Sequence, residues 1–255
     1  MSKSIFILIL FFSSISTICQ ASLHPDYDNN CKAMQCAHAE VDPFDNPLHT
    51  KYFNKPVPKL IHQIWFGNQN RKPQVKTMQW EKYAEIFDYE YRCYSEKDEA
   101  FMHLVMSSDE YDMVKKMLSR KDYWAASDIF RVALLREYGG IYIDCDFSPP
   151  HHHETLVDFD QFLDLTGITL VTEHHGREVG ESAIFVMNGI LMACPHHPIM
   201  EGMSKYILSN LHHFYHHKKK VNAMYCTGPI LLNKVIWGTF NVVPIGYKEQ
   251  LGKDD

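Results

Sequence analysis

The sequence predicts an α/β fold in which helices flank a mainly parallel, open sheet. Segments with strand-like patterns alternate with segments of helical periodicity from residue 58 to residue 245, an order typical of layered α/β architectures. The 255 residues are 45% hydrophobic and 22% charged, which is the balance of an ordinary globular protein. No internal repeat is visible. We therefore expect one globular domain over residues 57–255.

Charge and hydropathy exclude two classes of protein. The formal net charge is −6, whereas nucleic-acid-binding proteins usually have a basic surface, so we expect no nucleic-acid partner. The sequence has no uninterrupted run of 18 apolar residues, which excludes a multi-span membrane protein.

The first 21 residues have the pattern of a secretory signal peptide. Lys3 precedes the apolar run 5–12, and the segment ends in Cys19-Gln20-Ala21, which resembles a cleavage site. An uncleaved signal-anchor is the alternative, because the apolar run is only slightly short for a membrane span. Either reading implies export from the cytosol, as a secreted, periplasmic or secretory-lumen protein or as a membrane-anchored one. Residues 22–56 are rich in Pro, Asn, Asp and His and are predicted to form an irregular leader.

Cysteine usage is compatible with an exported protein. Beyond the signal peptide the chain has six cysteines, an even number that permits disulfides in an oxidising compartment. Six cysteines allow 15 pairings, so the sequence assigns none of them. They are Cys31, Cys36, Cys93, Cys145, Cys194 and Cys226.

The first half of the domain is predicted to contain two strands and two or three helices. An apolar strand over 60–66 is followed by a helix over 77–87 and a strand over 89–94. Residues 97–120 have amphipathic spacing with a break at Ser107-Ser108, where Ser108 is expected to cap the second helix.

The second half begins with an apolar helix over 124–138, ended by Gly139-Gly140. A short strand over 141–144 follows directly. The remaining predicted elements are strands at 168–172, 183–187 and 241–245 and helices at 197–211 and 229–237.

A charged pair interrupts the apolar helix over 124–138. Asp128 and Arg131 are three residues apart and therefore share one face of the helix. An intrahelical ion pair without further function is the simplest interpretation. A binding role is the alternative, because polar groups on an apolar helix need partners.

Two carboxylates follow the strand over 141–144. Strand alternation directs Ile141 and Ile143 to the core, and directs Tyr142, Asp144 and Asp146 together to the other side. Two carboxylates on one side repel each other unless a cation lies between them, and a hard divalent cation suits oxygen ligands. Two solvated acids in a turn are the alternative. The carboxyl end of a strand in an open α/β sheet favours ligand binding.

Four motifs in order resemble those of glycosyltransferase family 32, the DXD-containing sugar transferases, and the related clostridial glucosylating toxins. They are PKLIHQIWFG, SDIFRVALLREYGGIYIDCDF, AIFVMNGILMACPHHPIM and CTGPILL, which together extend over about residues 56–235. The family's usual His- and Trp-bearing tail has no counterpart in this sequence.

The resemblance implies a GT-A fold and roles for individual residues. Trp65 would stack on the nucleobase, and Ile64 would hold it through the backbone. Donor-sugar hydroxyls would be bound by Asp128 and Arg131, with Tyr142 nearby. In the DXD motif, Asp144 would contact the ribose or sugar and reach the metal through water, and Asp146 would ligate it directly.

The resemblance also implies an activity. A retaining hexosyl transfer from a UDP- or GDP-sugar to a hydroxyl acceptor is expected, with Mn²⁺ or Mg²⁺ held by the DXD motif; a glycan, a lipid or a protein would carry the acceptor hydroxyl. Two alternatives stay open: an exported nucleotide-sugar-binding protein without catalysis, and an effector that glycosylates a host protein.

A histidine cluster offers a second possible metal site. His212 with His216, and His213 with His217, have the i, i+4 spacing of helical metal ligands. The cluster runs into Lys218-Lys219-Lys220, which repels cations, so a solvated helix end is the competing interpretation.

Overall fold

A computed structural model describes residues 55–152, 155–162, 168–174, 184–209 and 223–240 of the chain. The predicted signal peptide, residues 22–54 of the predicted leader, the last predicted strand (241–245) and the histidine cluster at 212–217 lie outside the described residues. Within the described part, no helix is both long and apolar enough to span a membrane.

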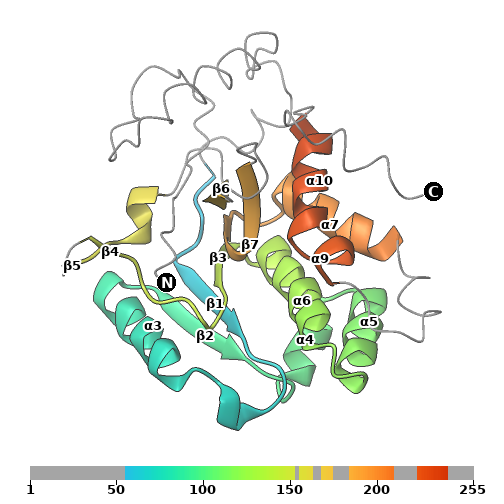
Figure 1. Ribbon diagram of the computed structural model, residues 1–255, viewed down its shortest axis with the longest axis horizontal. Helices are drawn as coiled ribbons and strands as arrows, with labels where there is room; N and C mark the ends of the chain where they lie inside the picture. The colour runs from blue at the N-terminus through green and yellow to red at the C-terminus, as the bar shows by residue number, and fades with distance from the viewer. Residues whose placement is uncertain (1–54, 153–154, 163–167, 175–183, 210–222, 241–255) are drawn as a thin grey trace.

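A five-stranded sheet forms the centre of the molecule (Figure 1). Its strands, in spatial order, are β2 (Glu90–Tyr94), β1 (Leu60–Ile64), β3 (Gly140–Ile143), β7 (Ile184–Ala193) and β6 (Ile168–His174). The α/β class and the open sheet are confirmed. The parallel direction holds only for β2, β1 and β3, whereas β7 runs antiparallel to both β3 and β6, so the sheet is mixed rather than mainly parallel.

The sheet is mixed because of how its strands are connected. Helices α3 and α6 separate β1, β2 and β3, and such crossovers return the chain in the same direction. Strand β7, by contrast, pairs antiparallel with both of its neighbours, β3 and β6. Strand β7 is also longer than predicted, because it continues through Asn188 and Gly189 into the apolar residues 190–193.

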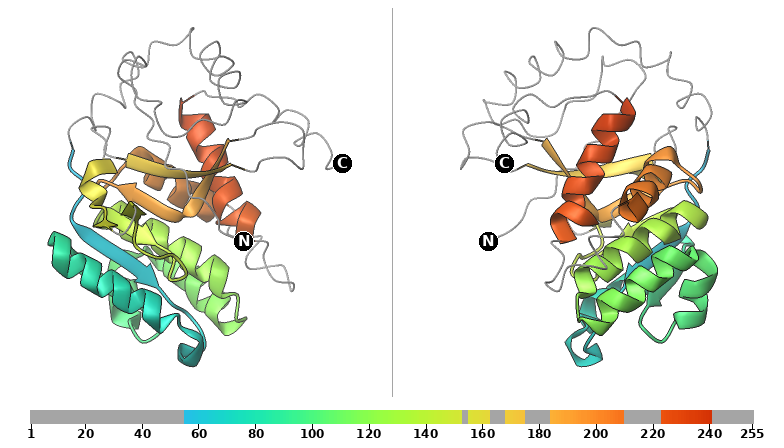
Figure 2. Two further views of the ribbon diagram at one scale, coloured as in Figure 1. Left: turned by 60° about the vertical axis from the view of Figure 1, so that its left-hand side comes forward. Right: turned by 90° about the vertical axis from the view of Figure 1, so that its right-hand side faces the viewer.

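Helices cover both faces of the sheet (Figures 1 and 2). Helix α3 (Gln74–Phe87) packs Trp80 and Tyr83 on one face, against Ile141 and Ile143. The larger core lies on the other face, around α6 (Tyr123–Glu137). It also includes α4 (Glu99–Val105), α5 (Ser108–Ser119), α7 (Pro198–Ser209) and α10 (Pro229–Phe240).

The remaining elements are short. They are the 3₁₀ turns η2 (Gln69–Arg71) and η3 (Phe159–Phe162), the two-stranded sheet of β4 (His151–His152) and β5 (Thr155–Leu156), and the one-turn helix α9 (Ala223–Cys226).

The predicted break between α4 and α5 is confirmed, but the capping residue is Ser107 rather than Ser108. The Ser107 hydroxyl accepts a hydrogen bond from the Glu110 backbone N–H at 3.3 Å, and the Glu110 carboxylate accepts one from the Ser107 N–H at 2.9 Å. This reciprocal capping box satisfies two backbone donors that the first turn would leave free.

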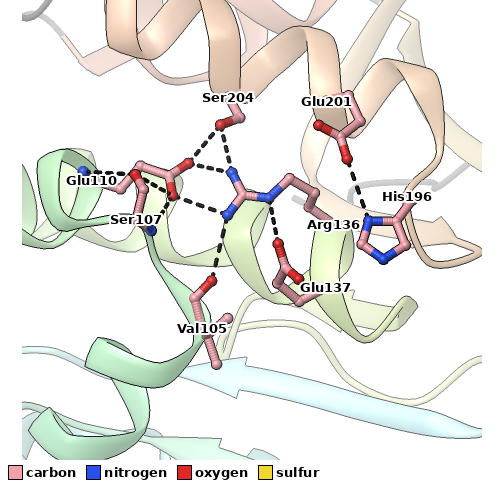
Figure 3. Close-up of polar contacts among 8 residues, drawn as sticks. All are labelled: Val105, Ser107, Glu110, Arg136, Glu137, His196, Glu201 and Ser204. Atoms are coloured by element: carbon pink, nitrogen blue, oxygen red, sulfur yellow. Dashed lines mark hydrogen bonds and ion pairs between the residues drawn. The ribbon is translucent and has the colours of Figure 1, made fainter.

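The Glu110 carboxylate also joins three helices (Figure 3). It accepts hydrogen bonds from Arg136 of α6 at 2.5 Å and from the Ser204 hydroxyl of α7 at 2.6 Å. Arg136 also contacts the more exposed Glu137 at 2.8 Å. Because Glu110 and Arg136 are buried, each charge depends on the other for compensation.

Candidate active site

The predicted ion pair of α6 lies at the centre of a larger polar cluster. Arg131 contacts Asp128 at 3.0 Å and, across the helix–sheet boundary, the Asp144 carboxylate at 3.3 Å. Its guanidinium also lies 4.3 Å from the ring centroid of Tyr142 and donates a hydrogen bond to the carbonyl of Asn188. The interpretation as a purely intrahelical pair is therefore wrong, because Arg131 connects α6 with β3 and β7.

Asp128 is held by residues distant in the sequence. Its Oδ1 accepts from the Asn188 side-chain amide at 2.8 Å, and its Oδ2 accepts from the Thr227 hydroxyl at 2.9 Å. Burial raises the pKa of Asp128 to about 6, although Arg131 and the Thr227 hydroxyl favour the charged form.

Asp144 lies at the end of β3, where the alternation of the strand turns it toward α6. Its Oδ1 accepts a hydrogen bond from the Tyr142 hydroxyl at 2.6 Å. Burial raises the pKa of Asp144, Arg131 opposes that rise, and the nearby charge of Asp146 adds to it. Tyr142 is itself buried, so this side of β3 faces the larger core around α6 rather than solvent.

Asp146 is exposed, and the main chain around it is anchored by α3. Lys76 donates a hydrogen bond to the Asp146 carbonyl, and the Trp80 indole N–H donates to the Phe147 carbonyl at 3.0 Å. These contacts hold the loop after β3 and leave the Asp146 carboxylate in solvent.

Two glycines allow main chain to approach the carboxylates closely. A Cβ at Gly189 would lie 2.9 Å from Asp144 Oδ2, and one at Gly228 would lie 3.1 Å from Asp128 Oδ2. A side chain at either position would push against a carboxylate of the cluster.

The end of β1 lies beside the DXD loop. The Ile64 carbonyl accepts a hydrogen bond from the Cys145 thiol at 3.5 Å. Trp65 follows, half-buried, with its indole N–H on the Asn68 carbonyl at 3.1 Å. The structure thus brings Asp128, Arg131, Tyr142 and Asp144 into direct contact, places Asp146 next to them and puts Ile64 against the same loop.

Sequence reasoning did not single out Asn188 or Thr227. Both lie inside motifs that carried the resemblance, the Met-Asn-Gly of residues 187–189 and the Thr-Gly-Pro of residues 227–229. A polar side chain between apolar residues and a glycine was the available signal, but only the fold shows that both bind Asp128.

The residues also fit a divalent cation. Asp144 and Asp146 supply carboxylate oxygens at one loop. No group of three or more His, Cys, Asp or Glu side chains is arranged to hold a metal in the described part of the chain, so a cation would have two protein ligands here. Two carboxylates suit Mg²⁺ or Mn²⁺, which fill the remaining positions with phosphate oxygens and water.

Comparison with a solved structure defines the class of fold. The PaToxG glycosyltransferase superposes with a TM-score of 0.50 at 18% identity, over 83% of this chain and 79% of that chain. The catalytic domain of alpha-toxin from Clostridium novyi gives a TM-score of 0.46 at 10% identity, over 84% and 80% of the two chains. The likeness to PaToxG shows that this chain has a GT-A-type fold.

Comparison of sequences shows which family the residues around the site resemble. Residues 60–163 match the family model described as a glycosyltransferase sugar-binding region containing a DXD motif. Inositol phosphoceramide mannosyltransferase 3 of Schizosaccharomyces pombe is 24% identical over 206 residues, or 77% of this chain and 49% of that protein. The chain therefore spans about half the length of this curated relative. The resemblance to the DXD-containing glycosyltransferases is confirmed.

Proposed function

We propose that this protein is a retaining glycosyltransferase that moves a hexosyl group from a UDP- or GDP-sugar to a hydroxyl acceptor. The observation that carries the proposal is the position of Arg131, which binds both Asp128 and Asp144 while its Nε–H has no hydrogen-bond partner among the described residues. A buried donor without a partner is rare in folded proteins. A ligand oxygen in the cluster would satisfy it.

The carboxylate of Asp128 has capacity for one further contact. Its two oxygens offer about four lone-pair positions, of which Arg131, Asn188 and Thr227 occupy three. The remaining position is available for a donor-sugar hydroxyl. Trp65 and Ile64 would hold the nucleobase at the end of β1. The ring of Tyr142, which packs against the Arg131 guanidinium, would help to position that side chain at the sugar site.

A divalent cation, Mn²⁺ or Mg²⁺, would be held by Asp144 and Asp146 against the donor diphosphate. When bound, it supplies positive charge that stabilises the negative charge of the leaving diphosphate. The charge of Asp144 is already compensated in part by Arg131, and its Oδ1 accepts a hydrogen bond from Tyr142, whereas Asp146 is exposed and free to ligate. Asp146 is therefore the direct ligand in this proposal.

The transfer breaks the bond between the anomeric carbon and the diphosphate oxygen and forms a bond from that carbon to the acceptor oxygen. The proton of the acceptor hydroxyl passes to the leaving diphosphate oxygen on the same face of the sugar, which retains the anomeric configuration. Carboxylate contacts to the sugar favour the oxocarbenium-like transition state, as in glycoside hydrolysis.

The name of the fission-yeast relative suggests the first substrates to test. It is a mannosyltransferase acting on inositol phosphoceramide, so a mannosyl donor and a lipid headgroup hydroxyl have priority among the glycan, lipid and protein acceptors. We further propose that the protein is exported and carries out this reaction outside the cytosol.

A donor screen tests the proposal. Purified protein is incubated with UDP- and GDP-sugars, with and without Mn²⁺, and release of free sugar or its transfer to an acceptor is measured, with the anomer of the product read by NMR. Binding of a nucleotide-sugar without hydrolysis or transfer under any condition would favour the non-catalytic alternative.

The Asp146→Asn variant tests the metal site. It should lose Mn²⁺-dependent turnover and the rise in melting temperature that Mn²⁺ with nucleotide produces, because that rise measures binding to the folded state. Its melting temperature without metal should be unchanged or higher, since one of two repelling carboxylates is removed. The control is Asp112→Asn, which removes an exposed carboxylate from α5. Wild-type metal dependence in Asp146→Asn would refute the assignment.

A further inference from the structure

Helix α10 carries a fully buried polar side chain, that of Asn233. The helix lies beside β7, the strand that contains Asn188 (Figure 1). A buried amide costs free energy unless its donors and its acceptor are paired. The hydrogen bonds of Asn233 therefore show what this side chain holds in place.

The Asn233 amide binds main chain in two separate segments. Its Oδ1 accepts a hydrogen bond from the Val186 N–H at 3.1 Å, and its Nδ2 donates to the Val186 carbonyl at 2.9 Å. The same Nδ2 donates to the Pro229 carbonyl at 2.7 Å. One side chain thus connects a point in β7 with the first residue of α10.

These two points adjoin the residues that hold Asp128. Val186 stands two residues before Asn188, whose amide donates to Asp128 Oδ1 at 2.8 Å. Pro229 stands two residues after Thr227, whose hydroxyl donates to Asp128 Oδ2 at 2.9 Å. The spacing between the two hydrogen-bond donors of Asp128 is therefore set in part by a single side chain of α10.

The strand pairing of β7 is irregular near Val186. Strand β3 is in register with residues 190–193 of β7, and the pairing with β6 has a register shift between Leu170 and Thr172. Two residues that face each other in an antiparallel sheet can exchange both of their main-chain hydrogen bonds. The Asn233 amide reproduces that exchange, because it binds both the N–H and the carbonyl of Val186.

We propose that Asn233 is a positioning residue for the sugar part of the donor. It holds Asn188 and Thr227 at the spacing that fixes the Asp128 carboxylate. The linkage between these residues is a property of the fold. Only its effect on binding of the donor sugar rests on the proposed function.

A double-mutant cycle tests the linkage without any ligand. The free energy of unfolding is measured for Asn233→Ala, for Thr227→Val and for the double variant. The loss in the double variant should be smaller than the sum of the two single losses, because both substitutions disturb the same arrangement around Asp128. Additive losses would overturn the linkage.

A second cycle supplies the control. Tyr83 lies in the core around α3, and its hydroxyl donates to the Val157 carbonyl at 2.9 Å. Tyr83→Phe shares no hydrogen-bond partner with Asn233, so its loss should add to that of Asn233→Ala. If Asn233→Ala does not fold, Asn233→Asp takes its place in both cycles. It keeps the shape of the side chain and the acceptor for the Val186 N–H, and it removes the two amide donors.

Donor affinity tests the effect on the sugar. Calorimetric titrations with Mn²⁺ compare UDP with UDP-glucose and GDP with GDP-mannose, and the ratio of the dissociation constants in each pair measures the contribution of the hexose. Asn233→Ala should reduce that contribution about tenfold, as loss of a hydrogen bond to a buried carboxylate would. The affinity for UDP or GDP itself should stay close to that of the wild type, because Trp65 and Asp146 lie on other elements.

Val235→Ala is the matched control for the titrations. Val235 is buried in the same helix and packs on α7, where a Cβ added at Gly202 would lie 2.8 Å from its Cγ1. Its truncation should lower the free energy of unfolding and leave the contribution of the hexose unchanged.

Equal losses of the hexose contribution in Asn233→Ala and Val235→Ala would show a purely structural role and overturn the positioning role. An unchanged contribution in Asn233→Ala would overturn its effect on the donor. A wild-type protein that binds neither nucleotide-sugar would count against the proposed function, while the double-mutant cycle still decides on the linkage.

Discussion

Arg131 makes the candidate site possible because its guanidinium contacts three elements at once. It binds Asp128 within α6, Asp144 after β3 and the Asn188 carbonyl of β7. Burial disfavours its charge, but the surrounding carboxylates outweigh that effect and raise the pKa of Arg131. The cluster is therefore a fixed, charged arrangement before any ligand arrives, which reduces the reorganisation needed during a reaction.

Thr227 positions Asp128, and its removal should affect donor binding. Thr227→Val keeps the shape of the side chain but leaves Asp128 Oδ2 without a donor, at a cost of about 1–3 kcal/mol. We expect the KM for the donor to rise about tenfold or more, with a smaller change in kcat. Thr227→Ser, which restores the hydroxyl, should stay close to wild type. Equal KM values for the Val and Ser variants would show that the hydroxyl does not act through Asp128.

Trp65 should report on the nucleobase. Ring stacking contributes about 0.5–1.5 kcal/mol beyond burial, so Trp65→Ala should weaken donor binding several-fold while the fold is retained. Trp65→Phe preserves an aromatic face and should recover most of the affinity. Calorimetric titration of the donor into each variant measures the effect. Unchanged affinity in Trp65→Ala would remove this residue from the site.

At the residue scale, the sequence predicts contacts that are local. Asp128 and Arg131 are one helical turn apart, and Asp144 and Asp146 share one strand end, so spacing alone pairs them. Asn188 and Thr227 lie 60 and 99 residues from Asp128. Side-chain periodicity carries no information on contacts at that separation, and these two residues became visible only in the fold.

The elements around the site are held by a second buried cluster, which predicts a contrast between two glutamates. Glu110→Gln leaves the buried Arg136 charge without its main counter-ion and should lower the free energy of unfolding by about 3–5 kcal/mol. Glu137→Gln removes a more exposed partner of the same arginine and should cost less than about 1 kcal/mol. Chemical denaturation measures both. Similar losses for the two variants would contradict the structural role of Glu110.

His62 connects β1 with β2 and with the turn after α6 through hydrogen bonds. Because it is buried, it should make the free energy of unfolding depend on pH. Its ring nitrogens contact the Tyr94 hydroxyl at 3.1 Å and the Gly139 carbonyl at 2.9 Å, and burial lowers the pKa of His62 to about 4. The unfolded chain, with a pKa near 6.5, therefore binds a proton that the folded state does not. The free energy of unfolding should fall as pH falls from 6.5 to 4, by about 3 kcal/mol in total.

The His62 contribution is separated from those of other groups by substitution. His62→Gln should lose this part of the pH dependence, while His103→Gln, an exposed histidine of α4, should retain it. Denaturation at a series of pH values supplies the comparison. Parallel pH profiles for the wild type and His62→Gln would contradict the assignment.

At the element scale, hydrophobic periodicity predicts which segments form helices and strands, but not how strands pair. The alternation in β7 is the same whether the strand runs parallel or antiparallel, so its reversed direction could not be predicted. The cap of α5, by contrast, could have been predicted. Ser107 stands three residues before Glu110, which is the spacing of a capping box, whereas Ser108 stands three residues before Tyr111.

Across the whole molecule, the site is placed where two cores meet. Helix α3 and its aromatic core fix the DXD loop from one side of the sheet, through Trp80 and Lys76. Helix α6 and the larger core fix Asp128 and Arg131 on the other side. Neither side of the sheet alone supplies all the candidate binding residues, so the site depends on the assembled domain. This dependence makes ligand-induced stabilisation a test of the whole fold as well as of the site.

The last prediction concerns the protein as it is produced in its native host. Residues 1–21 have a basic start, an apolar run and a small-residue end, and we expect this leader to be removed close to Ala21. N-terminal sequencing and intact mass measurement of protein purified from the host should then give a chain that begins near Ser22. A signal-anchor would instead leave Met1 or its immediate neighbour at the terminus, and the protein would be extracted from membranes only with detergent because the apolar run stays inserted. A full-length chain that needs no detergent would contradict both forms of export and would place the proposed transfer in the cytosol.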